Sequence, residues 1–134
     1  MKSPYTLALM AAALIAAPLA HAHHSFAAEF DRSKPVKLTG VVTKLEWQNP
    51  HIWFYIDVKN EDGSVNNWGF SGSSPIQLMR RGVRKTVLQP GMTVTVDGFR
   101  TKDSSNNGSA STVTFPDGKS VFTTVADDPN ENKN

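Results

Sequence analysis

HIWFYIDV, residues 51–58, is the stretch of the chain that decides its fold class. Its apolar residues Ile52, Phe54, Ile56 and Val58 alternate strictly with His51, Trp53, Tyr55 and Asp57. Successive side chains of a β-strand point to opposite faces, so this alternation predicts a strand with one buried face and one open face. Asn49-Pro50 precedes the strand and Glu61-Asp62-Gly63 follows it, and the Asp-Gly pair indicates a hairpin turn.

Upstream of this strand, the apolar pattern of residues 36–47 changes phase after Gly40. Val36 and Leu38 occupy one face, and the next apolar residues are Val41, Leu45 and Trp47. A phase change at a glycine is typical of a β-bulge, and bulges bend strands around barrels. The sequence therefore predicts a first strand that is bulged at Gly40.

Downstream, residues 65–71 form a third strand, which carries Trp68 and Phe70 toward the core. Residues 74–82 form a short helix, because Ser74 can cap it, Pro75 suits its first position and Gly82 suits its end. A fourth strand follows, in which Met92, Val94 and Val96 point inward, and then a hairpin of residues 110–115 and 120–124.

This order predicts a mainly β protein: an OB-fold-like antiparallel barrel of five to six strands, with one short helix between the third and fourth strands. The alternative is an open antiparallel sheet with one helix on it. A length of 134 residues fits one domain. We expect residues 36–125 to form the barrel, residues 23–35 to pack on it, and residues 126–134 to be a disordered tail.

The N-terminus has the three parts of a secretory signal peptide. Lys2 provides the positive start, residues 6–19 the apolar run, and Ala20-His21-Ala22 the cleavage site. The alternative is a membrane anchor, but the apolar run is short for a bilayer and no second run exists. We expect a signal peptide at residues 1–22, cleavage after Ala22, and a soluble periplasmic protein whose mature form has no membrane span.

The composition narrows the possible functions. The chain has no cysteine, which excludes disulfides, thiolate metal sites and cysteine nucleophiles. Its 14 Lys and Arg residues against 12 Asp and Glu give a net charge of only +2. So small an excess gives no general argument for nucleic-acid or membrane binding, and nucleic acid is an unattractive partner for an exported protein.

Three histidines are candidate metal ligands. Cleavage after Ala22 leaves His23 with a free α-amine beside its imidazole, and His24 follows directly. Amine and imidazole donors suit copper(II) first, and nickel or zinc next. His51 completes the site if the N-terminal segment folds back over the barrel, with Glu29 and Asp31 as further oxygen donors. The alternative is a flexible His-His terminus, with His51 bonded to a backbone carbonyl at a strand end.

Trp53 and Tyr55 lie on the open face of the 51–58 strand and are candidates for binding a small ligand or a partner protein. The alternative is that these rings pack against Phe26 and Phe30, which share a face if residues 25–30 make a helical turn.

A basic cluster follows the helix and is a candidate site for an anion, a lipid headgroup or an acidic partner. Its members are Arg80, Arg81, Arg84 and Lys85. The alternative is a solvated surface that complements the helix C-terminus.

The sequence carries no phosphate-binding glycine loop, nucleophile elbow or HExxH motif, so it favours a binding module over an enzyme. The leading hypothesis is a periplasmic module that binds a divalent metal through His23, His24 and His51. The alternatives are a metal-free accessory module acting through Trp53 and Tyr55, and a copper-dependent oxidoreductase.

Several motifs together resemble a family of small exported bacterial proteins known only as a domain of unknown function. The motifs are HHSFAAEFD at 23–31, LTG at 38–40, EWQNPH at 46–51, RRG at 80–82 and VDGFR at 96–100. The resemblance covers nearly all of the chain after residue 22 and implies a single periplasmic domain, with no activity or ligand attached. The leading His23 is also similar to the N-terminal histidine of periplasmic copper-binding proteins and copper oxygenases, which have different folds.

Overall fold

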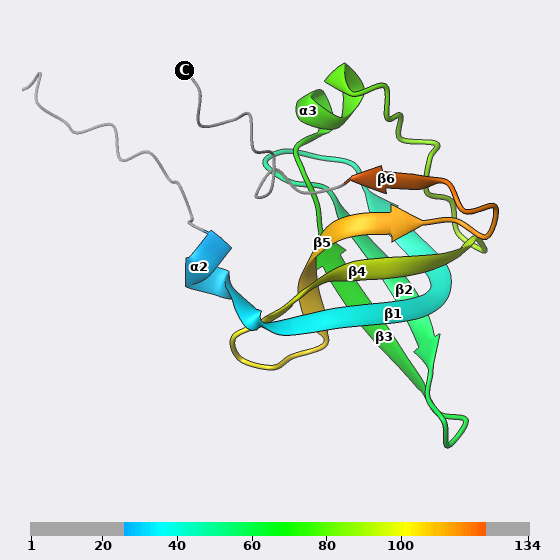
Figure 1. Ribbon diagram of the computed structural model, residues 1–134. Helices are drawn as coiled ribbons and strands as arrows, with labels where there is room; N and C mark the ends of the chain where they lie inside the picture. Colours follow the sequence, from blue (N-terminus) through cyan, green and yellow to red (C-terminus); the bar gives the residue numbers. More distant parts are fainter. Residues whose placement is uncertain (1–25, 123–134) are drawn as a thin grey trace, which may run out of the picture.

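The computed structural model describes residues 26–122, which form six strands and two short helices (Figure 1). The helices are α2 (Phe26–Glu29) and α3 (Pro75–Arg80). The strands are β1 (Phe30–Glu46), β2 (Trp53–Lys59), β3 (Val65–Ser71), β4 (Thr93–Thr101), β5 (Asn107–Thr114) and β6 (Ser120–Phe122). The predicted signal peptide, His23, His24 and the predicted tail at 126–134 lie outside the described residues.

The six strands lie in one sheet in the order β3-β2-β1-β4-β5-β6, and neighbours in this order are antiparallel. A further, parallel pairing joins Gly69–Ser71 of β3 to Asn107–Ser109 of β5 and brings the first five strands round into a ring. The ring is not cleanly closed, because this pairing spans only three residue pairs. The prediction of a mainly β, OB-like barrel with a short helix between the third and fourth strands is confirmed.

The long strand β1 bends because it serves two neighbours. It pairs with β4 from Phe30 to Val41 and with β2 from Val41 to Glu46. The bulge lies between Val42 and Lys44, so the predicted position of the bulge at Gly40 is wrong. Val42 is 1% exposed and Val41 is 42% exposed, the reverse of the predicted phase.

Gly40 matters for a different reason, which is the close approach of β2. A Cβ atom at Gly40 would lie 2.5 Å from the backbone oxygen of Asp57. No side chain fits there without moving one of the two strands. The glycine therefore lets β1 pass close to β2 at the crossing, before the bulge changes the phase.

Helix α3 closes one end of the barrel. The Ser74 side chain accepts a hydrogen bond from the backbone N–H of Gln77 at 3.4 Å, and Pro75 begins the helix. Gly82 ends it with a φ of +81°, as predicted for a C-terminal glycine. Leu78, which is fully buried, points from the helix into the core that Phe54, Phe70 and Val96 also form.

The segment before the predicted first strand packs on the barrel through aromatic rings. β1 begins at Phe30, six residues before the expected start at Val36. The Phe26 ring lies 5.3 Å from that of Phe30 and 5.7 Å from that of Phe99 on β4, centroid to centroid. These two rings therefore pack on each other and on β4, so the interpretation that they cover Trp53 and Tyr55 on β2 is wrong.

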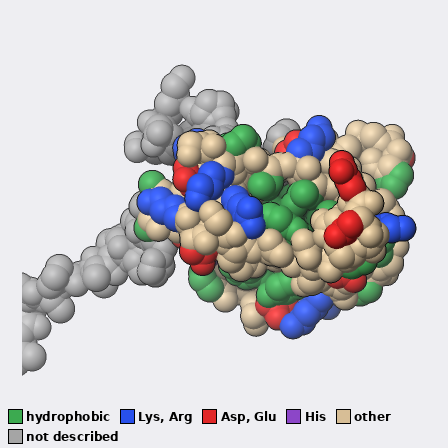
Figure 2. Space-filling view, turned by 90° about the horizontal axis from the view of Figure 1, so that it is seen from below, with side chains coloured by type: hydrophobic (Ala, Val, Ile, Leu, Met, Phe, Trp, Pro, Cys, Tyr) green, Lys and Arg blue, Asp and Glu red, His purple; other side chains and the backbone are tan. Residues whose placement is uncertain are grey.

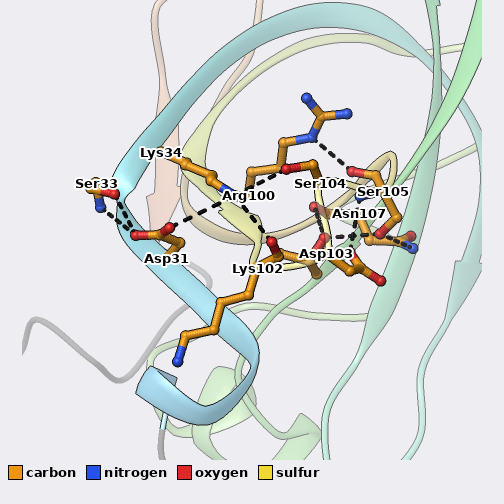
Figure 3. A network of polar contacts seen from close by, with 10 residues as sticks. Asp31, Ser33, Lys34, Arg100, Lys102, Asp103, Ser104, Ser105 and Asn107 are labelled. Carbon is orange, nitrogen blue, oxygen red and sulfur yellow. Dashed lines mark hydrogen bonds and ion pairs between the residues drawn. The ribbon is translucent and has the colours of Figure 1, made fainter.

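The β4–β5 loop, residues 102–106, takes part in a network of polar contacts with β1 and β4 (Figure 3). The Lys34 ammonium donates to the Lys102 carbonyl oxygen at 3.0 Å and to Ser104 Oγ at 2.9 Å, which ties β1 to this loop. Arg100 donates from Nε to the Ser105 carbonyl oxygen at 2.8 Å, and its guanidinium lies 5.0 Å from the centre of the Trp68 ring. Figure 2 shows the surface of the molecule seen from below. Hydrophobic side chains gather at the centre of that surface, with a group of Lys and Arg side chains to their left.

Within residues 26–122, none of the helices has the length and hydropathy that a membrane span requires.

Candidate functional site

The outer face of β2 carries the side chains that the sequence analysis proposed for binding. Burial alternates along the strand, with Ile52 at 1% exposure and Phe54 and Ile56 at 0%. Between them, Trp53 and Tyr55 are half-buried on the opposite face. The predicted alternation is confirmed, and it places both aromatic rings on the outside of the barrel.

The strand register adds neighbours from β1, β3 and β5 to this face. Trp53 pairs with Glu46 on one side and Ser71 on the other, and Tyr55 pairs with Lys44 and Gly69. We call this surface the β2 face; its members are Lys44, Glu46, Trp53, Tyr55, Asp57, Asn67, Gly69 and Asn107. Only two of these, Trp53 and Tyr55, were among the candidates named from the sequence.

The Tyr55 ring lies over Gly69. A Cβ atom added at Gly69 would lie 3.0 Å from Tyr55 Cε1 and 2.7 Å from Asn107 Oδ1. The Lys44 ammonium is 5.7 Å from the centre of the ring, and the Tyr55 hydroxyl is 3.5 Å from Glu46 Oε2. The ring is therefore held in one position before any ligand arrives, which lowers the entropy lost on binding.

Hydrogen-bonding groups with fixed orientation lie beside the ring. The Asn67 amide donates to Asp57 Oδ1 at 2.8 Å and to Thr43 Oγ1 at 3.3 Å. Lys44 forms an ion pair with Glu46, and the hydrogen bond with that carboxylate raises the pKa of the Lys44 ammonium. The face thus carries one cation and two carboxylates. The cation is paired with one carboxylate and the other carboxylate is hydrogen-bonded to an amide, so the face has no large area of a single charge sign.

Chemically, this arrangement suits stacking and directional hydrogen bonding. An aromatic plane can pack against the apolar face of a ligand, and amides and carboxylates can bond to hydroxyl groups at its edge. The face formed by strands 2 and 3 is also where OB-folds bind oligonucleotides and oligosaccharides. The near balance of charge disfavours a strongly anionic ligand such as a nucleic acid.

His51 lies exposed just before β2, and its Nδ1 is 3.1 Å from the carbonyl oxygen of Gly72. This is the contact to a backbone carbonyl that the alternative interpretation expected. A proton on Nδ1 makes this hydrogen bond and leaves the Nε2 lone pair available, the arrangement common for metal-ligating histidines. Among residues 26–122, no group of three or more His, Cys, Asp and Glu side chains is placed to hold a metal ion.

Asp31, considered above as an additional metal ligand, has other partners. Its Oδ1 accepts hydrogen bonds from the Ser33 hydroxyl at 2.6 Å and the Ser33 backbone N–H at 2.9 Å (Figure 3). These bonds hold the pKa of the Asp31 carboxyl below its usual value. Its second oxygen is 3.8 Å from the Lys34 ammonium. The contacts of this carboxylate therefore lie within the irregular part of β1 between Phe30 and Pro35, which they stabilise.

The basic residues at the end of α3 are all exposed. Arg80 is the last residue of the helix and Arg81 is its C-cap, and Arg84 and Lys85 lie in the turn that follows Gly82. Within the described residues, no carboxylate is within ion-pairing distance of Arg80, Arg84 or Lys85.

Sequence reasoning missed Gly69 and Asn67, and one of them carried a signal. A glycine inside a strand, between Trp68 and Phe70, indicates a close approach by another group. Asn67 had no such signal, because its role depends on the register that sets it opposite Asp57.

The family model described as a family of unknown function (DUF6152) matches residues 11–111. No curated protein and no solved structure matches the chain significantly. The chain belongs to the DUF6152 family, which agrees with the resemblance drawn from its motifs.

Proposed function

We propose that this member of the DUF6152 family is an exported, periplasmic binding module that holds a neutral, hydroxyl-rich ligand of the saccharide class on its β2 face. The observation that carries the proposal is the Tyr55 ring seated over Gly69, where no side chain fits beneath it. The module needs no catalytic group of its own, because the face supplies only stacking and hydrogen bonding.

Two features of the face support a neutral ligand over a charged one. The Lys44 ammonium is already paired with Glu46, so it offers little net attraction to an anion. The Asn67 amide donates to Asp57 at 2.8 Å and to Thr43 at 3.3 Å, so the pair leaves carboxylate and amide oxygens as acceptors for a ligand. Neutral hydroxyl groups can donate to these oxygens without a change of protonation.

The test is a titration of the exported protein with neutral oligosaccharides of four or more units, followed by tryptophan fluorescence and calorimetry. Tyr55→Ser should weaken binding about tenfold, the value of one aromatic contact. Val65→Ser removes an exposed apolar side chain (57% exposed) from the β2–β3 hairpin and serves as the matched control, with no change expected. Binding that survives both Tyr55→Ser and Trp53→Ser would contradict the proposal.

A second candidate function is copper(II) binding, for which the hydrogen bond from His51 Nδ1 to the Gly72 carbonyl oxygen leaves the Nε2 atom available. In this proposal the α-amine and ring of His23, with His24, hold the ion, and His51 adds its Nε2 atom. Imidazole and amine donors suit copper(II). The donor pair His23 and His24 is taken from the sequence, since both lie outside the described residues.

The copper proposal is tested by titrating copper(II) into the exported protein, whose N-terminal mass is measured first to identify the first residue. Bound copper(II) should quench Trp53, because two residues along a strand place it about 7 Å from His51. His51→Ala should lower the affinity and abolish that quenching, and Trp53→Phe should abolish the quenching alone. Equal affinity in the native and His51→Ala proteins would remove His51 from the site. A copper-loaded protein inert toward reductant and oxygen would exclude the oxidoreductase alternative.

A further inference from the structure

The outward side of α3 exposes apolar side chains that the core does not use. Leu78 is fully buried and fills the end of the barrel, whereas Ile76 is 52% exposed and Met79 is 43% exposed. Ile76, Met79 and Arg80 are spaced three and four residues apart, so they share the side of the helix opposite Leu78.

Positive charge is concentrated beside these apolar side chains. Arg80, Arg84 and Lys85 are exposed, and together with Ile76 and Met79 they form what we call the α3 patch. The sequence contains no Asp or Glu between Asp62 and Asp97. Among the described residues, the charged side chains of the patch are therefore all positive, in a chain whose net charge is only +2.

The patch is held in shape by the core beneath it. After the Gly82 turn, the Val83 backbone N–H donates to the Leu78 carbonyl oxygen at 2.9 Å, and the Val87 N–H donates to the Arg84 carbonyl oxygen at 2.9 Å. Leu88, 2% exposed, anchors the end of the segment in the core. In Figure 1, α3 stands out from the end of the barrel, beyond the strands.

We infer that the α3 patch docks the protein onto an anionic lipid surface. Cations flanking exposed aliphatic side chains match a bilayer interface, where phosphate headgroups lie above acyl chains. The charge is complementary to such a surface, and Ile76 and Met79 would enter the apolar layer. A free phosphate or other small anion would use the cations alone, and the patch has no aromatic ring on which a nucleic-acid base could stack.

The experiment measures sedimentation of the exported protein with vesicles of phosphatidylglycerol and phosphatidylcholine at low and high salt. Each cation near an anionic surface contributes about fivefold to partitioning, so replacing Arg80, Arg84 and Lys85 by Gln should reduce binding about 100-fold. The matched control replaces Lys37, Lys59 and Lys119, three exposed cations on other surfaces, by Gln and keeps the same net charge. This control should lose much less binding.

The apolar side chains of the α3 patch are tested by the double variant Ile76→Ser with Met79→Ser. The control is the double variant Val41→Ser with Val65→Ser, which changes two exposed apolar residues elsewhere. The first pair should reduce vesicle binding about tenfold and the second should not. Vesicles of phosphatidylcholine alone report any binding that does not depend on the anionic headgroup, in every variant. Three results would overturn the inference: equal losses in the two triple variants, no loss in the Ile76/Met79 variant, or inhibition of vesicle binding by millimolar inorganic phosphate at constant ionic strength.

Discussion

Gly69→Ala is the sharpest test of how the β2 face is built. The new methyl group would lie 2.7 Å from Asn107 Oδ1 and 3.0 Å from Tyr55 Cε1. Both neighbours are side chains, so they can move while the strands keep their register. Moving Asn107 loses its 3.2 Å hydrogen bond to Ser105 Oγ, a cost of about 1 kcal/mol. Tilting the Tyr55 ring away from its preferred rotamer costs about 1 kcal/mol more.

The alanine also restricts the unfolded chain, which returns about 0.5–1 kcal/mol of stability. The expected net loss in the free energy of unfolding is therefore about 1 kcal/mol. For a domain of this size that lowers Tm by about 4–8 °C in a thermal unfolding experiment followed by circular dichroism. The saccharide affinity should fall as well, because the ring would be displaced from its position over Gly69.

A double-mutant cycle isolates the contribution of the ring. In a Tyr55→Ser background the methyl group no longer meets the ring and Asn107 is its close contact, so the loss from Gly69→Ala should be close to zero. The coupling energy between positions 55 and 69 should then be about 1 kcal/mol. An equal loss in both backgrounds would show that the ring does not rest on the glycine, and the proposed binding face would lose its central feature.

Three further predictions concern the barrel itself. Gly40→Ala should destabilise more than Gly69→Ala, because its methyl group would meet the backbone oxygen of Asp57 at 2.5 Å; thermal unfolding of the two variants compares them, and a smaller loss at Gly40 would contradict the close approach. Leu78→Ala should lower the free energy of unfolding by about 3 kcal/mol in urea denaturation, and a loss under 1 kcal/mol would mean that α3 does not fill the barrel end. The backbone N–H of Ser105 holds the pKa of Asp103 at about 2, below its usual 3.8, so its stabilisation is complete above pH 4 and is lost as the pH falls to 2. Asp103→Asn should therefore flatten the decline of Tm between pH 4 and pH 2, and an unchanged decline would refute that assignment.

The elements that sequence predicted well are those set by local rules. The alternation of 51–58 defines β2 and its outer face because side-chain direction repeats every two residues. The Ser74 cap and the Gly82 turn define α3 because helix ends need those residues for their unpaired backbone groups. Neither prediction requires knowledge of which strands are neighbours.

The errors lie where pairing partners decide the outcome. Val41 and Val42 are both apolar, so the pattern alone cannot choose which one faces the core. The choice is made by β1 itself, which leaves β4 after Val41 and joins β2, and the bulge follows at that change of partner. The contact between Tyr55 and Gly69 depends in the same way on the β2–β3 register. The assignment of His23 and His24 to a metal site stays a prediction.

The β2 face and the α3 patch are each the outer side of an element whose inner side packs in the core, and this position limits the kind of ligand that each can bind. Tyr55 lies between Phe54 and Ile56, which are fully buried, and Met79 follows Leu78 in the same way. A barrel this small fills its interior with side chains, so recognition is confined to shallow outer faces. A shallow face cannot enclose most of a small molecule, as pockets for drug-sized ligands do. High affinity must then come from a ligand that is large enough to contact much of such a face. On the β2 face this favours an oligomeric saccharide over a single sugar. At α3 it favours an extended lipid surface over a single headgroup.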